Sequence, residues 1–118
     1  MKAKDLLGRR GELLAADFLE DRGIKVIDRN WRCPTGEIDL VAIDGETLVI
    51  AEVKTRRSLR YGHPFESITA AKLVRLQTLA VLWSRHHAVF LPHTRIDALG
   101  VLDDGGPDPV VEYLQGVG

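Results

Sequence analysis

The first part of the chain, residues 2–22, repeats small and apolar side chains with the period of an α-helix. One row recurs at spacings of four, three and four residues and consists of Leu7, Gly11, Leu14 and Phe18. A second row beside it consists of Gly8, Glu12, Ala15 and Leu19. Glu12 is the one charged residue in these rows, so we expect it either at the edge of the core or directed at a partner. The helix should end at Gly23, because glycine adopts the left-handed cap conformation at no steric cost.

Three strand-like segments follow the helix, namely residues 25–31, 37–43 and 47–55. In the second segment, alternation divides the side chains between two faces, with Ile38, Leu40 and Ala42 on one and Glu37, Asp39, Val41 and Ile43 on the other. The third segment is the most apolar, which indicates a central strand. Asp44-Gly45 before it is a strong hairpin signal, because both turn positions tolerate positive φ.

The second half of the chain is predicted to contain one more helix and two more strands. A loop over residues 56–64 precedes a helix from about residue 67 to 86, whose buried side should contain Leu73, Leu76, Ala80 and Trp83. Residues 94–101 and 110–114 are typical of strands. The order helix, three strands, helix, strand indicates an α/β fold with a mixed sheet covered on both faces. The helix before the fourth strand permits a right-handed crossover to a parallel neighbour.

Length and composition restrict the class of protein. A chain of 118 residues can bury one core, so we expect a single domain over residues 1–118, frayed over its last few residues. With 45% hydrophobic and 28% charged residues, its composition is that of a globular protein. No apolar run approaches the roughly 20 residues that span a bilayer, and the N-terminal residues lack a secretory stretch. Cys33, a lone cysteine, cannot form an internal disulfide, so these features predict a cytoplasmic protein without membrane contact.

Charge is distributed unevenly, although the formal net charge is only −1. Residues 52–75 contain six basic and two acidic side chains, a local charge of +4, whereas the residues from Val101 onward carry −4. The basic side chains are Lys54, Arg56, Arg57, Arg60, Lys72 and Arg75. Each one alone is typical of a solvated surface. Together, all but Lys54 predict a track that contacts nucleic-acid phosphates.

The hairpin determines which acidic residues can meet. A two-residue loop at Asp44-Gly45 would pair Glu37 with Glu52, and a four-residue loop that starts at the same aspartate would pair Asp39 with Glu52. In both registers Asp39, Glu52 and Lys54 share a face, and two carboxylates lie within about 5–8 Å. A three-residue loop without a bulge would put them on opposite faces.

Two carboxylates this close repel each other unless a cation lies between them. Mg²⁺ or Mn²⁺ prefers carboxylate, water and phosphate oxygens, so Asp39 and Glu52 are the expected metal ligands. Lys54 would stabilise developing negative charge or orient the attacking water, and Glu12 would complete the site from the first helix. The alternatives are a solvated strand face for Glu52 and Lys54 and a surface ion pair for Glu12. Two charges within the most buried strand favour the catalytic interpretation.

Several of these segments together resemble the bacterial YraN family of predicted endonucleases. The resemblance runs from about Leu7 to Tyr113 and rests on Gly11-Glu12, Arg29-Asn30-Trp31-Arg32, Gly36-Glu37-Ile38-Asp39-Leu40-Val41, Glu52-Val53-Lys54-Thr55-Arg56, Gly62 and Lys72. That family is similar to archaeal Holliday junction resolvases and to the wider PD-(D/E)xK restriction-endonuclease-like fold. The resemblance therefore implies an αβββαβ core.

The resemblance also implies roles for individual residues. The metal ligands would be Asp39 and Glu52, assisted by Glu12 and by the main-chain carbonyl of Val53. Lys54 would activate water or stabilise the transition state. The Gln-x-x-x-Tyr helix motif of the RecB-like branch is not met, because Val81 stands four residues after Gln77, so no role is assigned to Gln77. Archaeal resolvases dimerise to cut two strands symmetrically, so a homodimer is a further implication.

The sequence thus predicts an endonuclease that uses Mg²⁺ or Mn²⁺ to hydrolyse phosphodiester bonds, with DNA favoured over RNA and branched or junction DNA as the substrate. The first alternative is a nucleic-acid-binding module that keeps the fold without turnover, which would bind DNA even after Glu52→Ala. The second is an interaction scaffold, which would not distinguish DNA from other polyanions.

Overall fold

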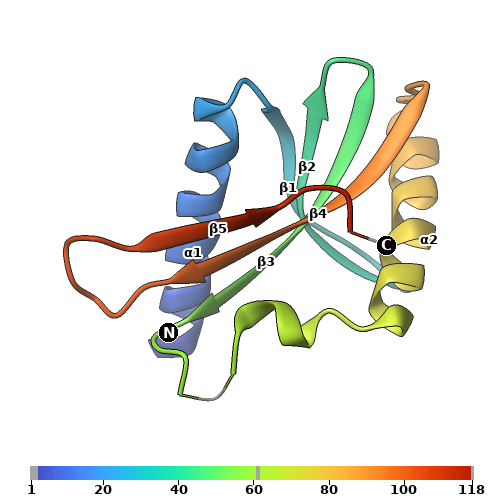
Figure 1. Cartoon of the computed structure of the whole chain (residues 1–118). Helices are drawn as coiled ribbons and strands as arrows, with labels where there is room; N and C mark the ends of the chain where they lie inside the picture. The colour runs from blue at the N-terminus through green and yellow to red at the C-terminus, as the bar shows by residue number, and fades with distance from the viewer. Residues whose placement is uncertain (1–2, 61, 118) are drawn as a thin grey trace.

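Two α-helices, one 3₁₀-helix and five strands make up the computed structural model, which describes residues 3–60 and 62–117 (Figure 1). In chain order they are α1 (Ala3–Asp21), β1 (Lys25–Cys33), β2 (Gly36–Asp44), β3 (Thr47–Arg56), η1 (Pro64–Ser67), α2 (Ala70–His87), β4 (His93–Leu102) and β5 (Val110–Leu114). Lys2, where the first helix is expected to begin, and Gly118, in the expected frayed end, lie outside the described residues. Neither α-helix of the described part is long and apolar enough to cross a membrane.

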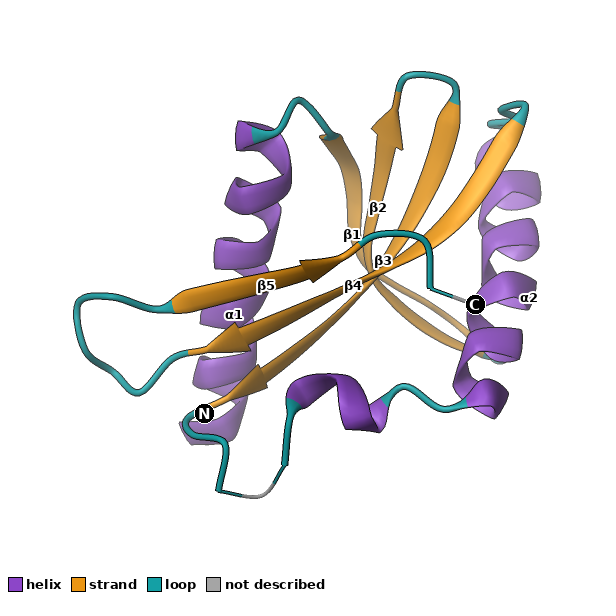
Figure 2. Ribbon diagram, viewed as in Figure 1, coloured by secondary structure: helices purple, strands orange, loops and turns teal. Residues whose placement is uncertain are grey.

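The five strands form one sheet in the order β1-β2-β3-β4-β5. Neighbouring strands are antiparallel except β3 and β4, which run parallel and are joined through η1 and α2. The α1 helix covers one face of the sheet and α2 covers the other (Figure 2). This is the predicted α/β architecture with a mixed, helix-flanked sheet, and it is compatible with a restriction-endonuclease-like core.

The second helix begins at Ala70, three residues later than predicted. Thr69 has extended backbone and is the N-cap, and its hydroxyl accepts the N–H of Lys72 at 3.2 Å. The residues before it, Pro64–Ser67, form the separate 3₁₀-helix η1. Lys72 therefore lies in the first turn of α2, where the cap fixes its backbone.

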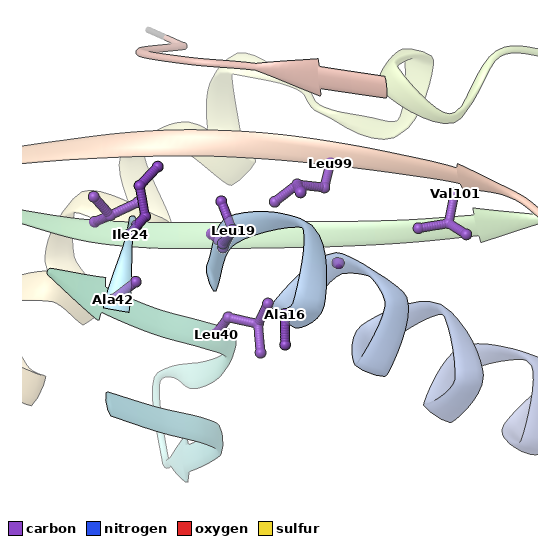
Figure 3. Packing of buried hydrophobic residues seen from close by; sticks show 10 residues of the cluster. Ala16, Leu19, Ile24, Leu40, Ala42, Leu99 and Val101 are labelled. Atoms are coloured by element: carbon purple, nitrogen blue, oxygen red, sulfur yellow. The ribbon is translucent and has the colours of Figure 1, made fainter. Parts of the chain in front are cut away.

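Small side chains let α1 approach the sheet closely. Ala15, Ala16 and Leu19 are fully buried, and they pack with Ile24, Leu40, Ala42, Val49, Ala51, Leu99 and Val101 (Figure 3). At Gly11 the approach is closest, because a Cβ atom added there would lie 1.9 Å from Oγ1 of Thr55 in β3. The next residue, Glu12, is thereby brought beside the sheet.

An ion pair holds the first half of α1 in this position. The Nε of Arg10 lies 2.7 Å from Oδ2 of Asp103, whose side chain is only 2% exposed. The backbone N–H of Asp103 donates to the carbonyl of Arg56 at 2.9 Å. Asp103 follows β4 and Arg56 ends β3, so these bonds attach α1 to the ends of both parallel strands.

The face under α2 has its own apolar cluster. Of the four residues of α2 predicted to be buried, three are buried, namely Leu76, Ala80 and Trp83. Leu79 is buried as well, although it was not predicted. Leu73 is partly buried at the edge of the cluster. From the sheet, the buried side chains are Ile38, Val41, Leu48, Ile50 and Ile96.

The position of Ile38 in this cluster corrects a prediction from the sequence. Strand alternation would put Ile38 on the α1 face together with Leu40 and Ala42, but only the latter two lie there. The neighbouring β1 strand is irregular at this level, because Asn30 has a left-handed backbone conformation with φ 51°. A regular pleat, which the prediction assumed, does not continue through this point.

Candidate active site

The β2–β3 hairpin has one of the two registers predicted for it. Its paired residues are Leu40–Ala51, Val41–Ile50, Ala42–Val49, Ile43–Leu48 and Asp44–Thr47. Gly45 in the turn has φ +60°, which glycine adopts without strain. This register is the one expected for the four-residue loop. If the pairing continued by one residue beyond Leu40–Ala51, Asp39 would lie opposite Glu52.

The acidic residues lie where the sheet divides. Beyond the Leu40–Ala51 pair, the remaining register pairs of β2 are with β1, and those of β3 are with β4. Figure 2 shows β1 and β2 turning away from β3, β4 and β5. The Oδ2 of Asp39 accepts the N–H of Val53 at 2.8 Å. The Asp39 carboxylate thus accepts a hydrogen bond that a backbone carbonyl of β2 would accept if the two strands stayed paired. This bond holds the carboxylate next to Glu52.

Burial and mutual repulsion raise the pKa of two of these carboxyl groups. Burial first, and then the charge of Glu52, raise the pKa of Asp39 to about 7, although the hydrogen bond from the β3 backbone opposes the change. Burial also raises the pKa of Glu12, and the charges of Glu37 and Glu52 add to the increase. A hydrogen bond from the Asn30 side chain acts in the opposite direction. Acidic groups from α1, β2 and β3 therefore share one electrostatic environment.

The cation that contacts Glu52 is Lys72 rather than Lys54. Glu52 is 8% exposed, and its Oε1 lies 2.6 Å from Nζ of Lys72. Lys54 follows Glu52 by two residues in β3, so it projects to the same side of the strand. It is half-buried and makes no ion pair with any side chain of the described residues. Two amines from different elements are thus available to one carboxylate.

A cavity of about 800 Å³ opens beside the acidic residues. Four carboxylates line it, those of Asp5, Glu12, Glu37 and Asp39, whereas Glu52 is not among the lining residues. Its other charged or polar lining residues are Arg9, Arg29, Asn30 and Arg32. The arginines and Asn30 were not assigned to a site from the sequence. The available signal was the Arg29-Asn30-Trp31-Arg32 motif, which the resemblance includes without a role.

The predicted phosphate track is spread over several elements. Arg56 ends β3, and Arg57 and Arg60 follow in the exposed segment after it. Arg75 is exposed on α2, one turn beyond Lys72. Lys72 differs from the others because it is engaged with Glu52. The track therefore meets the acidic site at Lys72.

The donor chemistry of the site suits a hard divalent cation at two carboxylates. Across residues 3–60 and 62–117, no group of three or more His, Cys, Asp or Glu side chains is arranged to hold a metal ion. Mg²⁺, however, is commonly bound through one or two carboxylates, with water and substrate phosphates completing its octahedron. Asp39 and Glu52 supply such a pair, and a cation between them would relieve their repulsion.

Comparison with known proteins gives the family. The model of the uncharacterised protein family UPF0102 matches residues 11–101, which include Glu12, Asp39 and Glu52. A UPF0102 protein of Renibacterium salmoninarum is 66% identical over 118 residues, covering all of both chains. One from Paenarthrobacter aurescens is 62% identical over 99% of this chain and 97% of its own, and one from Beutenbergia cavernae is 52% identical over the full length of both. The family expected from the sequence motifs is confirmed, and the chain belongs to UPF0102, the YraN family.

Proposed function

We propose that the protein is a divalent-metal-dependent endonuclease that hydrolyses phosphodiester bonds in DNA, with branched or junction DNA as its substrate. The main support is the meeting of Asp39 and Glu52 at the division of the sheet, where burial and repulsion raise the pKa of Asp39 to about 7. Buried like charges reduce the stability of a fold, so a purely structural role does not account for them. Such groups are typical of functional sites.

In this proposal, Asp39 and Glu52 hold Mg²⁺ or Mn²⁺, and Glu12 supports the site from α1. When bound, the ion would polarise a phosphate oxygen and lower the pKa of a coordinated water. Asp39 has to lose its proton to serve as a ligand, and Lys72 has to move from Oε1 of Glu52. The carbonyl of Val53 stays a predicted further ligand.

Basic side chains near the acidic residues and along the predicted track would bind and orient the substrate. Lys54 is half-buried beside Glu52 without an ion-pair partner in the described structure, so its charge is available to phosphate oxygens that gain negative charge. Arg9, Arg29 and Arg32 line the cavity that contains Asp39, and they would contact flanking phosphates. Arg56, Arg57, Arg60 and Arg75 would extend these contacts outward.

A cleavage assay tests the proposal. Linear duplex, flap and four-way-junction DNA are incubated with Mg²⁺ or Mn²⁺, and the native protein is compared with Glu52→Gln and Lys54→Met. Loss of a ligand or of a charge-stabilising group should reduce the cleavage rate by about 100-fold or more. Glu46→Gln is the matched control, because Glu46 is an exposed glutamate in the turn of the same hairpin and should be neutral.

The assay also separates the proposal from the alternative of a non-catalytic binding module. For a nuclease, Glu52→Gln should abolish cleavage while salt-sensitive DNA binding persists. Salt-sensitive binding by the native protein without cleavage of any substrate, under either metal, would instead favour the module. Analytical ultracentrifugation of the protein bound to the DNA that it cleaves would test the predicted homodimer, because it measures the number of protein chains in the complex.

A further inference from the structure

We propose that Asn30 is a positioning residue of the acidic site, whose side-chain amide holds the Glu12 carboxylate toward Asp39. This inference rests on the proposed function and assigns a role to the Arg29-Asn30-Trp31-Arg32 motif. Three observations support it: the backbone conformation of Asn30, its place opposite Asp39, and its place in the same cavity as Glu12.

The backbone of Asn30 is unusual for a residue within a strand. Its φ of 51° lies in the left-handed region, although Asn30 is in the middle of β1. Asparagine tolerates this conformation better than most residues, but in a strand it interrupts the regular pleat. Non-glycine residues held in such conformations cluster at functional sites, where the surrounding structure imposes them.

The strand register places Asn30 at the centre of the site. The pairs Arg29–Leu40 and Trp31–Ile38 flank it, so the residue across from Asn30 on β2 is Asp39. Asn30 also lines the same cavity as Glu12 and Asp39. The left-handed conformation therefore occurs directly opposite the residue whose carboxylate bridges the divided strands.

The side chain of Asn30 is placed to hold Glu12. The two residues line one cavity, and hydrogen bonding by the Asn30 side chain lowers the pKa of the Glu12 carboxyl group, whereas the charges of Glu37 and Glu52 raise it. Arg9, one turn earlier in α1, attracts the same carboxylate. Among the described residues, the Asn30 amide is the neutral donor that acts on Glu12, so without it we expect Glu12 to turn toward Arg9. An amide provides this bond without a charge that would compete with a metal cation.

The Asn30→Gly variant separates the effect of the backbone conformation at position 30 from the effect of the side-chain amide. Asn30→Gly keeps the left-handed conformation at no steric cost but removes the amide. We expect the midpoint of thermal unfolding to stay close to that of the native protein, while the affinity for Mn²⁺ in a calorimetric titration falls about tenfold, as is typical when a group that orients a metal ligand is lost. In a Glu12→Gln background the same substitution should change Mn²⁺ affinity by less than about twofold, because the group that Asn30 positions is already altered.

A second readout does not require a metal. In the crystal structure of metal-free Asn30→Gly, the Glu12 carboxylate should be turned toward Arg9 and away from Asp39, because the amide that holds it is gone. An unchanged Glu12 conformation, unchanged Mn²⁺ affinity, or an equal loss in the Glu12→Gln background would each overturn the role of Asn30. If the native protein does not bind Mn²⁺, the proposed function fails, and the Glu12 conformation then decides whether Asn30 acts on Glu12.

Discussion

At pH 8, the Asp39→Asn variant is expected to unfold at a higher temperature than the native protein. The native carboxylate is charged at this pH and is buried beside Glu52, both of which reduce stability. Asparagine has nearly the same shape, and its carbonyl oxygen can still accept the Val53 N–H that Asp39 accepts at 2.8 Å. The substitution therefore removes the charge and keeps the hydrogen bond.

The sign and the pH range of this effect follow from the raised pKa of Asp39. In the unfolded chain the group titrates near 3.8, and in the folded protein it titrates at about 7. Between these values the folded state holds a proton that the unfolded state has lost, so stability falls as pH rises through this range and stays low above pH 7. The difference between variant and native protein should be near zero below pH 4 and should reach at most about 4 kcal/mol above pH 7.

Chemical denaturation at pH 4, 6 and 8 measures this difference. The control is Asp104→Asn, because Asp104 also accepts one backbone N–H at 2.8 Å, from Gly106, but is exposed. The control should differ little from the native protein at every pH. We expect a larger stability difference between Asp39→Asn and the native protein at pH 8 than at pH 4. A difference that is no larger at pH 8 would contradict the burial and repulsion of this group.

Alanine at Gly11 is expected to have the largest destabilising effect of any substitution considered. The added Cβ would lie 1.9 Å from Oγ1 and 2.9 Å from Cβ of Thr55, so α1 and β3 would have to separate. Overpacking of this kind reduces the free energy of unfolding by about 2–3 kcal/mol, despite the better helix propensity of alanine. Displacement of α1 would also carry Glu12 away from Asp39, so Mn²⁺ affinity should fall.

Gly8 offers a matched control within the same helix. A Cβ atom added there meets nothing within 4 Å, so Gly8→Ala should raise the free energy of unfolding by roughly 0.5–1 kcal/mol through helix propensity alone. Thr55→Ala should partly restore the stability of Gly11→Ala, because it removes Oγ1 but leaves Cβ. Equal stability of the two glycine variants would mean that α1 does not pack on β3 as described.

Most of the fold could be predicted because its signals are local. Apolar periodicity identified both helices, alternation and turn residues identified the strands, and the Asp44-Gly45 signal reduced the hairpin to two registers that each bring Asp39 near Glu52. The register observed is one of these. The start of α2 at Ala70 differs from the prediction by three residues, because Pro64–Ser67 form a separate 3₁₀-helix and Thr69 caps α2.

The parts of the site that could not be predicted depend on contacts between distant segments. Local spacing singled out Lys54 as the amine beside Glu52, but nothing in that spacing shows that the first turn of α2 brings Lys72 within 2.6 Å of the same carboxylate. Ile38 lies on the α2 face and pairs with Trp31, the neighbour of Asn30, whose left-handed conformation no local spacing indicates. The lining of the cavity by Arg9 and Arg29 likewise depends on how α1 packs beside β1.

The most direct test of a metal site formed by Asp39 and Glu52 is the anomalous diffraction of a crystal soaked with manganese at pH 8, where Asp39 should be largely deprotonated. A Mn²⁺ peak in bonding contact with a carboxylate oxygen of both residues, with Nζ of Lys72 displaced from Glu52, is the expected result. A crystal with manganese bound elsewhere, or with none, and with the Lys72–Glu52 ion pair intact, would contradict it.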